Sequence, residues 1–327
     1  MQVVIDLILP VFAVIAIGFI AGKTKIVSAN GAKTLNDYVL YITLPALLFH
    51  AVATAPLSHL TNWDFLFANL FGIIGAFLIT VFVVRFVFKK RSAALSLYGM
   101  NASYGTSGFM GIPLLIVAFG QEAALPSAIA TVIHNIPVIA VVILTFEWSR
   151  AKRQTDDQGT WDFLKSVFKP VLLHPIMISV ILGLVFALAR IPLPNSLNIF
   201  TGFLADATGP TALFAIGLAL VNQKEALQWS SIMNKEIHFL IVIKTVLQPL
   251  LTIILVLFVF DLDPLWAITA ILMSALPIGP VTFVLAQKYE SITKETMIGI
   301  VLSLLISVIT ISLLFVFLID YYSIPTP

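Results

Sequence analysis

The stretch Asn101-Ala-Ser-Tyr-Gly-Thr-Ser-Gly-Phe-Met-Gly-Ile-Pro113 lies inside a long apolar run of the chain, residues 93–119. A second apolar run, residues 264–287, contains a similar interruption, Ser274-Ala-Leu-Pro-Ile-Gly-Pro-Val-Thr282. Proline removes a backbone donor and clashes with the preceding turn, and clustered glycine weakens a helix further. Both runs are therefore predicted to be helices that break near their middle.

The composition around these runs is that of a membrane protein. Of the 327 residues, 60% are hydrophobic and 10% are charged, and the mean hydropathy is +1.05. Such a chain holds more apolar surface than one water-soluble core can bury, so the predicted class is an all-α integral membrane protein. A formal net charge of +2 gives no case for nucleic-acid binding. The chain has no cysteine and its histidines lack metal-ligand spacing, so no metal and no cofactor are expected.

Ten segments are long and apolar enough to span a bilayer, which requires about 20 mostly apolar residues. They are residues 3–21, 35–54, 65–88, 93–119, 123–147, 172–189, 196–221, 237–260, 264–287 and 297–319. Most of the 18 Lys and Arg residues fall in the odd-numbered connections between these segments. Since positive charge stays in the cytoplasm, both termini are predicted to lie outside.

The two halves of the chain share unusual residues at a constant spacing. A shift of 165 residues pairs Pro10 with Pro175, Gly18 with Gly183, Pro45 with Pro210 and Phe49 with Phe214, and a shift of 164 pairs Pro113 with Pro277. Chance explains matching leucines in such a chain, but prolines and a glycine at one spacing favour a repeat. Each half then crosses the membrane five times, and this odd number makes the two repeats inverted. The predicted organisation is residues 1–148, a cytoplasmic linker at residues 149–170, and residues 171–327.

The two interrupted helices are the predicted binding site. Backbone groups freed in hydrocarbon are costly unless protein or a wet cavity satisfies them, and breaks related by inverted symmetry can cross each other. Half-helix N-termini attract anions. The candidate residues for binding a small organic anion are Asn101, Tyr104, Gly105, Thr106, Ser107, Gly108, Pro113, Asn135, Pro277, Gly279, Pro280 and Thr282. The alternative is a pair of ordinary proline kinks that neighbouring helices satisfy.

Two ionisable residues inside predicted spans are candidates for a coupling residue or a counter-charge. Asp206 either takes up a coupling proton or caps a kink in its helix. Lys244 either faces the substrate or extends its stem so that the ammonium reaches the cytoplasmic face.

Five motifs, in order along nearly the whole chain, resemble the auxin efflux carrier family. They are Leu44-Pro-Ala-Leu-Leu-Phe49, Gly108-Phe-Met-Gly-Ile-Pro-Leu114, His174-Pro-Ile with Gly183-Leu, Pro210-Thr-Ala-Leu-Phe-Ala-Ile-Gly-Leu218, and Leu276-Pro with Phe283-Val-Leu-Ala-Gln-Lys-Tyr289. The resemblance implies a bile-acid-symporter-like fold, with helices 1, 2, 6 and 7 as a scaffold, helices 3–5 and 8–10 as an elevator-like transport domain, and a homodimer. The short linker resembles that of bacterial members assigned to malate, malonate and related acids.

The chain departs from this family at its amides. Where many members have asparagine beside each break, this chain has Thr106 or Ser107 in the first and Val281 in the second, and His174 replaces a frequent asparagine. Hydroxyl groups, backbone amides or Asn101 would have to replace the missing pair.

The chain contains no nucleotide-binding motif, which excludes a primary pump within it. The favoured function is a secondary carrier, proton-coupled or uniport, for a mono- or dicarboxylate such as malate or malonate in a bacterial plasma membrane. Its expected partners are the organic acid and membrane lipid. The alternative is a channel or sensor for a small organic ligand. An enzyme is disfavoured because Asp206 and the histidines form no catalytic cluster.

Overall fold

A computed structural model describes residues 2–28, 31–54, 62–154, 173, 175–222 and 234–322. Within these ranges the regular elements are helices, and one isolated β-bridge joins two of the segments between them. The first half contains α1 (Gln2–Lys23), α2 (Gly31–Tyr38), η1 (Val39–Thr43), α3 (Leu44–Ala53), α4 (Trp63–Phe86), α5 (Ala94–Ser103), η3 (Ser107–Gly111), α6 (Ile112–Phe119), η4 (Gln121–Ala123) and α7 (Ala124–Gln154). The second half contains α9 (Pro175–Leu188), α10 (Asn195–Asn222), α12 (Lys235–Val242), η6 (Ile243–Leu247), α13 (Gln248–Phe258), α14 (Pro264–Ala275), α15 (Val281–Lys288) and α16 (Thr293–Tyr322).

The helices are those of a multi-pass membrane protein. Six helical stretches are long and apolar enough to cross a membrane: Gly31–Ala53, Trp63–Phe86, Ala124–Lys152, Asn195–Val221, Lys235–Phe258 and Thr293–Tyr322. Shorter apolar helices occupy Ala13–Lys23, Pro175–Leu188 and Pro264–Ala275. Helix is present in each of the ten predicted segments, while the count of ten crossings stays a prediction. The helix α7 runs on to Gln154, so the start of the predicted linker is helical, and residues 155–170 lie outside the described part of the chain.

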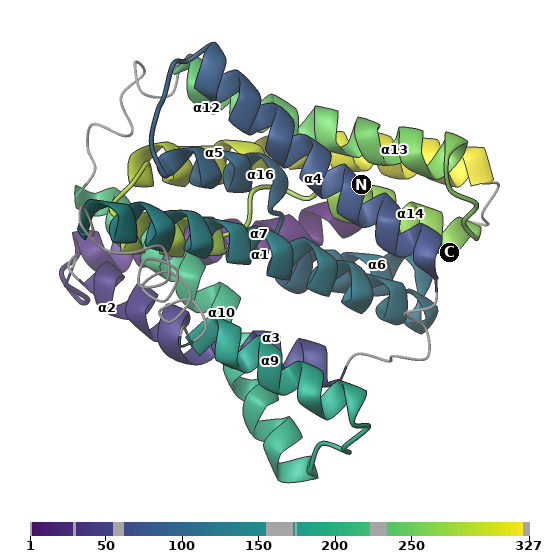
Figure 1. The fold of residues 1–327 in the computed structure, drawn as a ribbon, viewed down its shortest axis with the longest axis horizontal. Coiled ribbons are helices and arrows are strands. Elements are labelled where there is room, and N and C mark those ends of the chain that lie inside the picture. Colours follow the sequence, from purple (N-terminus) through teal and green to yellow (C-terminus); the bar gives the residue numbers. More distant parts are fainter. Residues whose placement is uncertain are drawn as a thin grey trace.

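The helices pack side by side in two groups. Figure 1 shows α2, α3, α9 and α10 together along one side of the bundle, and α4, α5, α12 and α13 along the opposite side. The helix α1 packs mainly on α10. The helix α14 packs on α4, α7, α13 and α16, and each of its residues from Ala267 to Ala275 is buried. Large apolar side chains such as Phe82, Phe203 and Leu313 are exposed on the outer faces, as expected for surfaces that meet lipid.

Two glycine contacts in the group containing α1, α3, α9 and α10 are equivalent under the shift of 165 residues. A methyl group at Gly18 of α1 would collide with the carbonyl oxygen of Phe214 in α10. A methyl group at Gly183 of α9 would lie 3.1 Å from the carbonyl oxygen of Phe49 in α3. In the repeat, Gly18 corresponds to Gly183 and Phe49 corresponds to Phe214. The contact of Gly18 with Phe214 in one half therefore corresponds to the contact of Gly183 with Phe49 in the other.

Three prolines inside helices each follow a widened turn. The π-helical turns η1, η3 and η6 end two residues before Pro45, Pro113 and Pro249 respectively. In each, the residue directly after the turn donates its backbone N–H five residues back rather than four. Since proline lacks an N–H and its ring crowds the preceding turn, the wider turn accommodates it without ending the helix.

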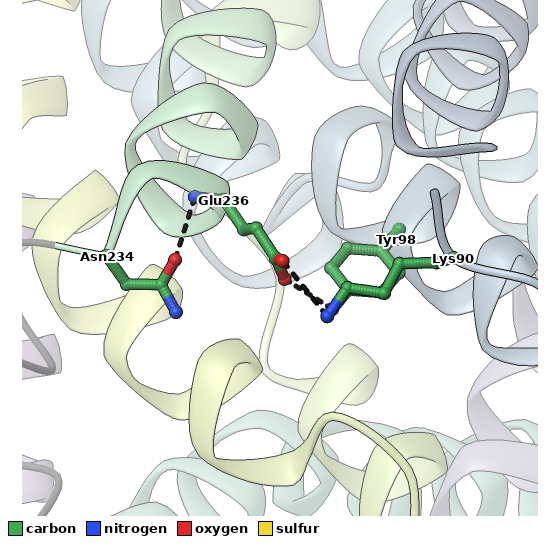
Figure 2. Close-up of polar contacts among 4 residues, drawn as sticks. All are labelled: Lys90, Tyr98, Asn234 and Glu236. Carbon is green, nitrogen blue, oxygen red and sulfur yellow. Dashed lines mark hydrogen bonds and ion pairs between the residues drawn. The ribbon is translucent and has the colours of Figure 1, made fainter. Parts of the chain in front are cut away.

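The connection between α4 and α5 is joined to the start of α12 by a polar cluster (Figure 2). The Glu236 carboxylate lies 3.0 Å from the Lys90 ammonium and accepts a hydrogen bond of 2.8 Å from the Tyr98 hydroxyl. The Asn234 side chain caps α12 by accepting from the backbone N–H of Glu236. These contacts place both segments at one end of the bundle, as the predicted alternation of loops requires.

Candidate functional site

The two predicted interruptions are present, and they lie against each other. The helix α5 ends at Ser103, and Tyr104 adopts an extended conformation with φ −84° and ψ 120°. Gly105 then pairs with Ile278, in the segment between α14 and α15, as an antiparallel bridge. The backbone N–H of Thr106 donates to the Pro277 carbonyl, and that of Gly279 donates to the Tyr104 carbonyl, both at 3.1 Å. We call residues 104–106 and 276–280 the crossing.

Glycine is required where the segments of the crossing touch. A methyl group at Gly279 would lie 2.5 Å from the Tyr104 ring and 2.8 Å from the Gly105 carbonyl oxygen. Both distances are well below van der Waals contact, so any other residue at this position would push the two segments apart.

Side chains from neighbouring helices satisfy several backbone groups that the breaks set free. The Ile278 N–H donates to the Ser303 hydroxyl of α16 at 3.1 Å, and the Thr282 hydroxyl donates to the Gly279 carbonyl at 2.7 Å. The Ser274 carbonyl at the end of α14 accepts a hydrogen bond of 2.7 Å from the Lys244 amino group. Lys244 therefore caps the carbonyl end of a half-helix, where the helix dipole favours a cation.

Lys244 is fully buried behind the crossing, with 0% of its surface exposed. Its Nζ donates to Gln248 Oε1 at 2.8 Å as well as to the Ser274 carbonyl, and a methyl group at Gly105 would lie 3.4 Å from this Nζ. This position excludes the alternative that the ammonium reaches the cytoplasmic face. Among the residues that the structure describes, no carboxylate forms an ion pair with Lys244.

Of the buried side-chain polar atoms that lack a hydrogen-bond partner in the described residues, Asn36 Oδ1 and Thr43 Oγ1 lie in α2 and η1, and the others lie on segments around the crossing. These others are Asn101 Oδ1, Thr106 Oγ1, His134 Nδ1, Gln248 Nε2 and Thr269 Oγ1. An unpaired buried polar group costs about 1–3 kcal/mol, and native proteins contain few of them. Several of them around one pair of broken helices indicate a place where a polar ligand binds.

Other side chains hold the predicted residues in position. Asn101 donates to the Thr296 hydroxyl of α16 at 3.0 Å. Ser107 donates to Asn135 Oδ1 of α7 at 3.2 Å. The neighbouring His134 pairs through Nε2 with Asn69 Oδ1 of α4 at 3.0 Å. These bonds join helices α4, α5, α7 and α16 around the crossing.

Three predicted residues flank the crossing in other ways. Gly108 lies in η3 against Thr131 of α7, and Pro280 is the residue directly before α15. The break falls inside the predicted stretch, at Tyr104–Thr106, and does not coincide with Pro113. Pro113 is the second residue of α6, seven residues beyond Thr106, where η3 accommodates it.

Asp206 lies apart from the crossing. Its side chain is exposed on α10, and it is close enough to His50 of α3 to interact electrostatically. The structure therefore brings together Lys244 and the predicted residues of the two breaks, but not Asp206.

A polar cavity of about 280 Å³ lies at the end of α15 distant from the crossing. Its lining includes Lys33, Asn36, Asp37 and Tyr41 from the segment containing α2 and η1, and Gln287 and Lys288 from α15. Asn36 donates to Gln287, and Lys288 donates to the Tyr41 hydroxyl.

Several residues of the site carry no strong signal in the sequence. Thr296 and Ser303 are small hydroxyl residues in the apolar helix α16, and His134 is a lone histidine in α7. Gln248 had one available signal, because it follows Lys244 by four residues and so lies on the same helix face.

The chain is a membrane protein with a polar site in its interior. Its apolar helices form a multi-pass bundle, and buried polar atoms surround the place where two interrupted helices touch. The family model described as membrane transport protein matches residues 3–315, and the chain belongs to this family, which is that of the auxin efflux carriers.

The chain is similar over nearly its full length to several proteins named as transporters or auxin carriers. A Rhizobium meliloti (strain 1021) protein named "Putative malonate transporter" is 27% identical over 315 residues, covering 95% of each chain. The uncharacterized transporter YfdV of Escherichia coli (strain K12) is 24% identical, covering 93% of this chain and 94% of its own. Auxin efflux carrier component 8 of Arabidopsis thaliana is 22% identical, covering 97% of each chain.

Proposed function

We propose that this protein is a secondary transporter that moves a small organic anion, a mono- or dicarboxylate such as malonate or malate, across a bacterial plasma membrane. The observation that carries the proposal is the crossing itself, with a buried lysine and unpaired polar atoms around it. The name of the Rhizobium relative supports malonate as the first acid to test. The proposal makes the protein a carrier and not an enzyme.

Electrostatics at the crossing favour an anion. Two half-helices, the one beginning with η3 and the one beginning with α15, start there and present their positive ends. Of the two half-helices that end there, α14 has its negative end capped by Lys244. The Lys244 ammonium and the helix starts together supply the positive potential that a carboxylate requires.

Side chains at the crossing supply the hydrogen bonds for this anion. The sequence predicts the hydroxyls of Tyr104, Thr106, Ser107 and Thr282 as donors. Those of Ser107 and Thr282 already donate, to Asn135 and to the Gly279 carbonyl, so the hydroxyls of Tyr104 and Thr106 remain for the anion. The structure adds the unpaired amide Nε2 of Gln248. This amide offers a replacement for one of the asparagines that the chain lacks beside its breaks. Gly108 leaves room for the ligand to approach the backbone, because a methyl group there would meet only Thr131, at 3.9 Å.

The transport cycle in this proposal is alternating access by an elevator-like movement. The scaffold consists of α1 with α2, α3, α9 and α10, and the remaining helices form the transport domain around the crossing. In this proposal the polar cavity between α2 and α15, at the end of α15 distant from the crossing, would lie at the boundary of the two domains on the cytoplasmic side. The contacts of Asn36 with Gln287 and of Tyr41 with Lys288 would break and reform during each cycle.

Ten helices in two inverted repeats complete the proposed architecture. The equivalent contacts of Gly18 with Phe214 and of Gly183 with Phe49 support the repeat, because a two-fold relation between halves produces such exchanged pairs. A homodimer and external termini are part of the same proposal.

The proposed ligand class is tested by thermal unfolding of the purified protein with a panel of small acids, amines and neutral compounds. A ligand that binds only the folded state raises the apparent unfolding temperature. We expect stabilisation by one or more mono- or dicarboxylates, with malonate and malate in the panel. Stabilisation by amines or neutral compounds alone would contradict the proposal.

A further inference from the structure

Among the described residues, no carboxylate forms an ion pair with Lys244 that would balance an ammonium. The elements packed against η6 include α4, α5, α14 and α16. The titratable side chains on facing segments are Tyr104, which lies at the crossing next to Gly105, and His134 of α7, which interacts electrostatically with Lys244. Within the described residues, α5 and α14 carry no carboxylate, and those of the other elements stand near helix ends: Asp64, Glu236, Glu295 and Asp320.

The hydrogen bonds of Lys244 match those of a neutral amine. A neutral amine has two N–H groups, and the structure offers two acceptors, Gln248 Oε1 at 2.8 Å and the Ser274 carbonyl at 2.7 Å. An ammonium has a third N–H, which requires a further acceptor near Gly105. These two acceptors therefore satisfy the amine completely but leave the ammonium one hydrogen bond and one counter-charge short.

A buried charge without a counter-charge costs several kcal/mol, and the group releases its proton instead where it can. An anion at the crossing reverses this preference, because it supplies the missing acceptor and the missing charge beside Gly105. We infer that Lys244 is the proton-coupling residue, which takes up one proton when the site binds its anion and returns it when the anion leaves. This inference rests on the proposed function.

In the binding reaction, the neutral Lys244 amine takes one proton from solution and becomes an ammonium, which pairs with the bound anion. The proton comes from the side on which the site is open and is released on the side to which the anion goes. A monoanion would then cross without net charge, and a dianion would cross with one negative charge. Because binding linkage is reciprocal, lowering the pH increases the affinity for the anion, and binding the anion increases the affinity for the proton.

The test is the number of protons taken up when malonate binds to the purified full-length protein. Isothermal titration calorimetry in pairs of buffers with different ionisation enthalpies measures this number between about pH 6 and pH 9. We expect wild type to take up about one proton per malonate over part of this range. In the pH range where this proton is taken up, the malonate Kd should rise by up to about tenfold for each unit by which the pH is increased.

Two substitutions assign the proton to Lys244. The variants Lys244→Met and Lys244→Arg replace the amine by a neutral chain and by a permanent cation, and we expect either of them, where it binds malonate, to do so without this proton uptake. Lys235→Arg, an exposed lysine at the start of α12, serves as the matched control and should behave as wild type. Thermal unfolding reports whether each variant is folded.

Two results would overturn the inference. One is malonate binding by wild type with no proton uptake at any pH, which would mean a permanently charged Lys244. The other is unchanged proton uptake in Lys244→Met, which would place the proton on the anion or another group. The wild-type result stands even where both variants fail to fold. Failure of the proposed function is distinguishable, because then neither malonate nor any other small acid binds.

Discussion

At Gly279 a single hydrogen atom lets two chain segments touch. The Tyr104 ring and the Gly105 carbonyl occupy the space where any other side chain would begin. We predict that Gly279→Ala separates the segments of the crossing, destabilises the protein by about 1–3 kcal/mol and reduces anion binding more than about tenfold. Gly75→Ala is the matched control, because a methyl group there meets only Leu251 of α13, at 3.5 Å. Thermal unfolding and malonate binding check both variants, and equal behaviour would contradict the role given to Gly279.

The polar cluster of Lys90, Tyr98 and Glu236 at the end of the bundle allows a second prediction at the residue scale, about stability. Tyr98 is 2% exposed and donates to Glu236, whereas Lys90 on the other side of this carboxylate is 42% exposed in its side chain. Glu236→Ala leaves the Tyr98 hydroxyl without its acceptor, and we expect a loss of about 1–3 kcal/mol. Lys90→Ala removes an exposed ion pair only and should cost at most about 1 kcal/mol. Thermal unfolding orders the two variants, and a larger loss for Lys90→Ala would refute this account of Figure 2.

At the scale of elements, the clusters of proline and glycine made both breaks predictable. The clusters at residues 101–113 and 274–282 predict two interrupted helices, because these residues act on their own backbone. Within the first cluster the break lies at Tyr104–Thr106 and not at Pro113, because a π-helical turn accommodates this proline. Thr296, Ser303 and Gln248 were not predicted as site residues, because their role depends on which helices pack together. The sequence also left open whether Lys244 is buried behind the crossing or reaches the membrane surface, because this too depends on which helices pack together.

The widened turn that carries Lys244 allows a prediction about Pro249. With Pro249→Ala, the turn η6 can tighten to an ordinary α-helical turn, which would rotate Lys244 away from the Ser274 carbonyl. We expect the unfolding temperature to change little, since a helix-breaking residue is removed, while malonate affinity falls about tenfold through loss of one charged contact.

Pro45→Ala is the matched control for this prediction. Pro45 likewise follows a π-helical turn, η1, but this turn belongs to the proposed scaffold. Replacing Pro45 should therefore leave malonate affinity unchanged. Equal affinities of wild type and Pro249→Ala would show that η6 does not position Lys244.

At the scale of the whole molecule, the loops predict an orientation that single cysteines can test. The chain has no native cysteine, so a cysteine introduced at one position is the only thiol. Lys89 and Asp263 are exposed and lie in connections predicted on opposite sides. A membrane-impermeant maleimide should label Lys89→Cys only from the cytoplasmic side and Asp263→Cys only from outside. Labelling of both from the same side would contradict the inverted arrangement of the halves.

The central claim is that the crossing carries an organic anion across the membrane, and counterflow in proteoliposomes measures this most directly. Vesicles loaded with unlabelled malonate should accumulate labelled malonate in a saturable manner with wild type and with Gly75→Ala, and not with Gly279→Ala. Absence of saturable uptake for malonate, malate and every other small acid that stabilises the protein, or steady single-channel conduction in its place, would contradict the account.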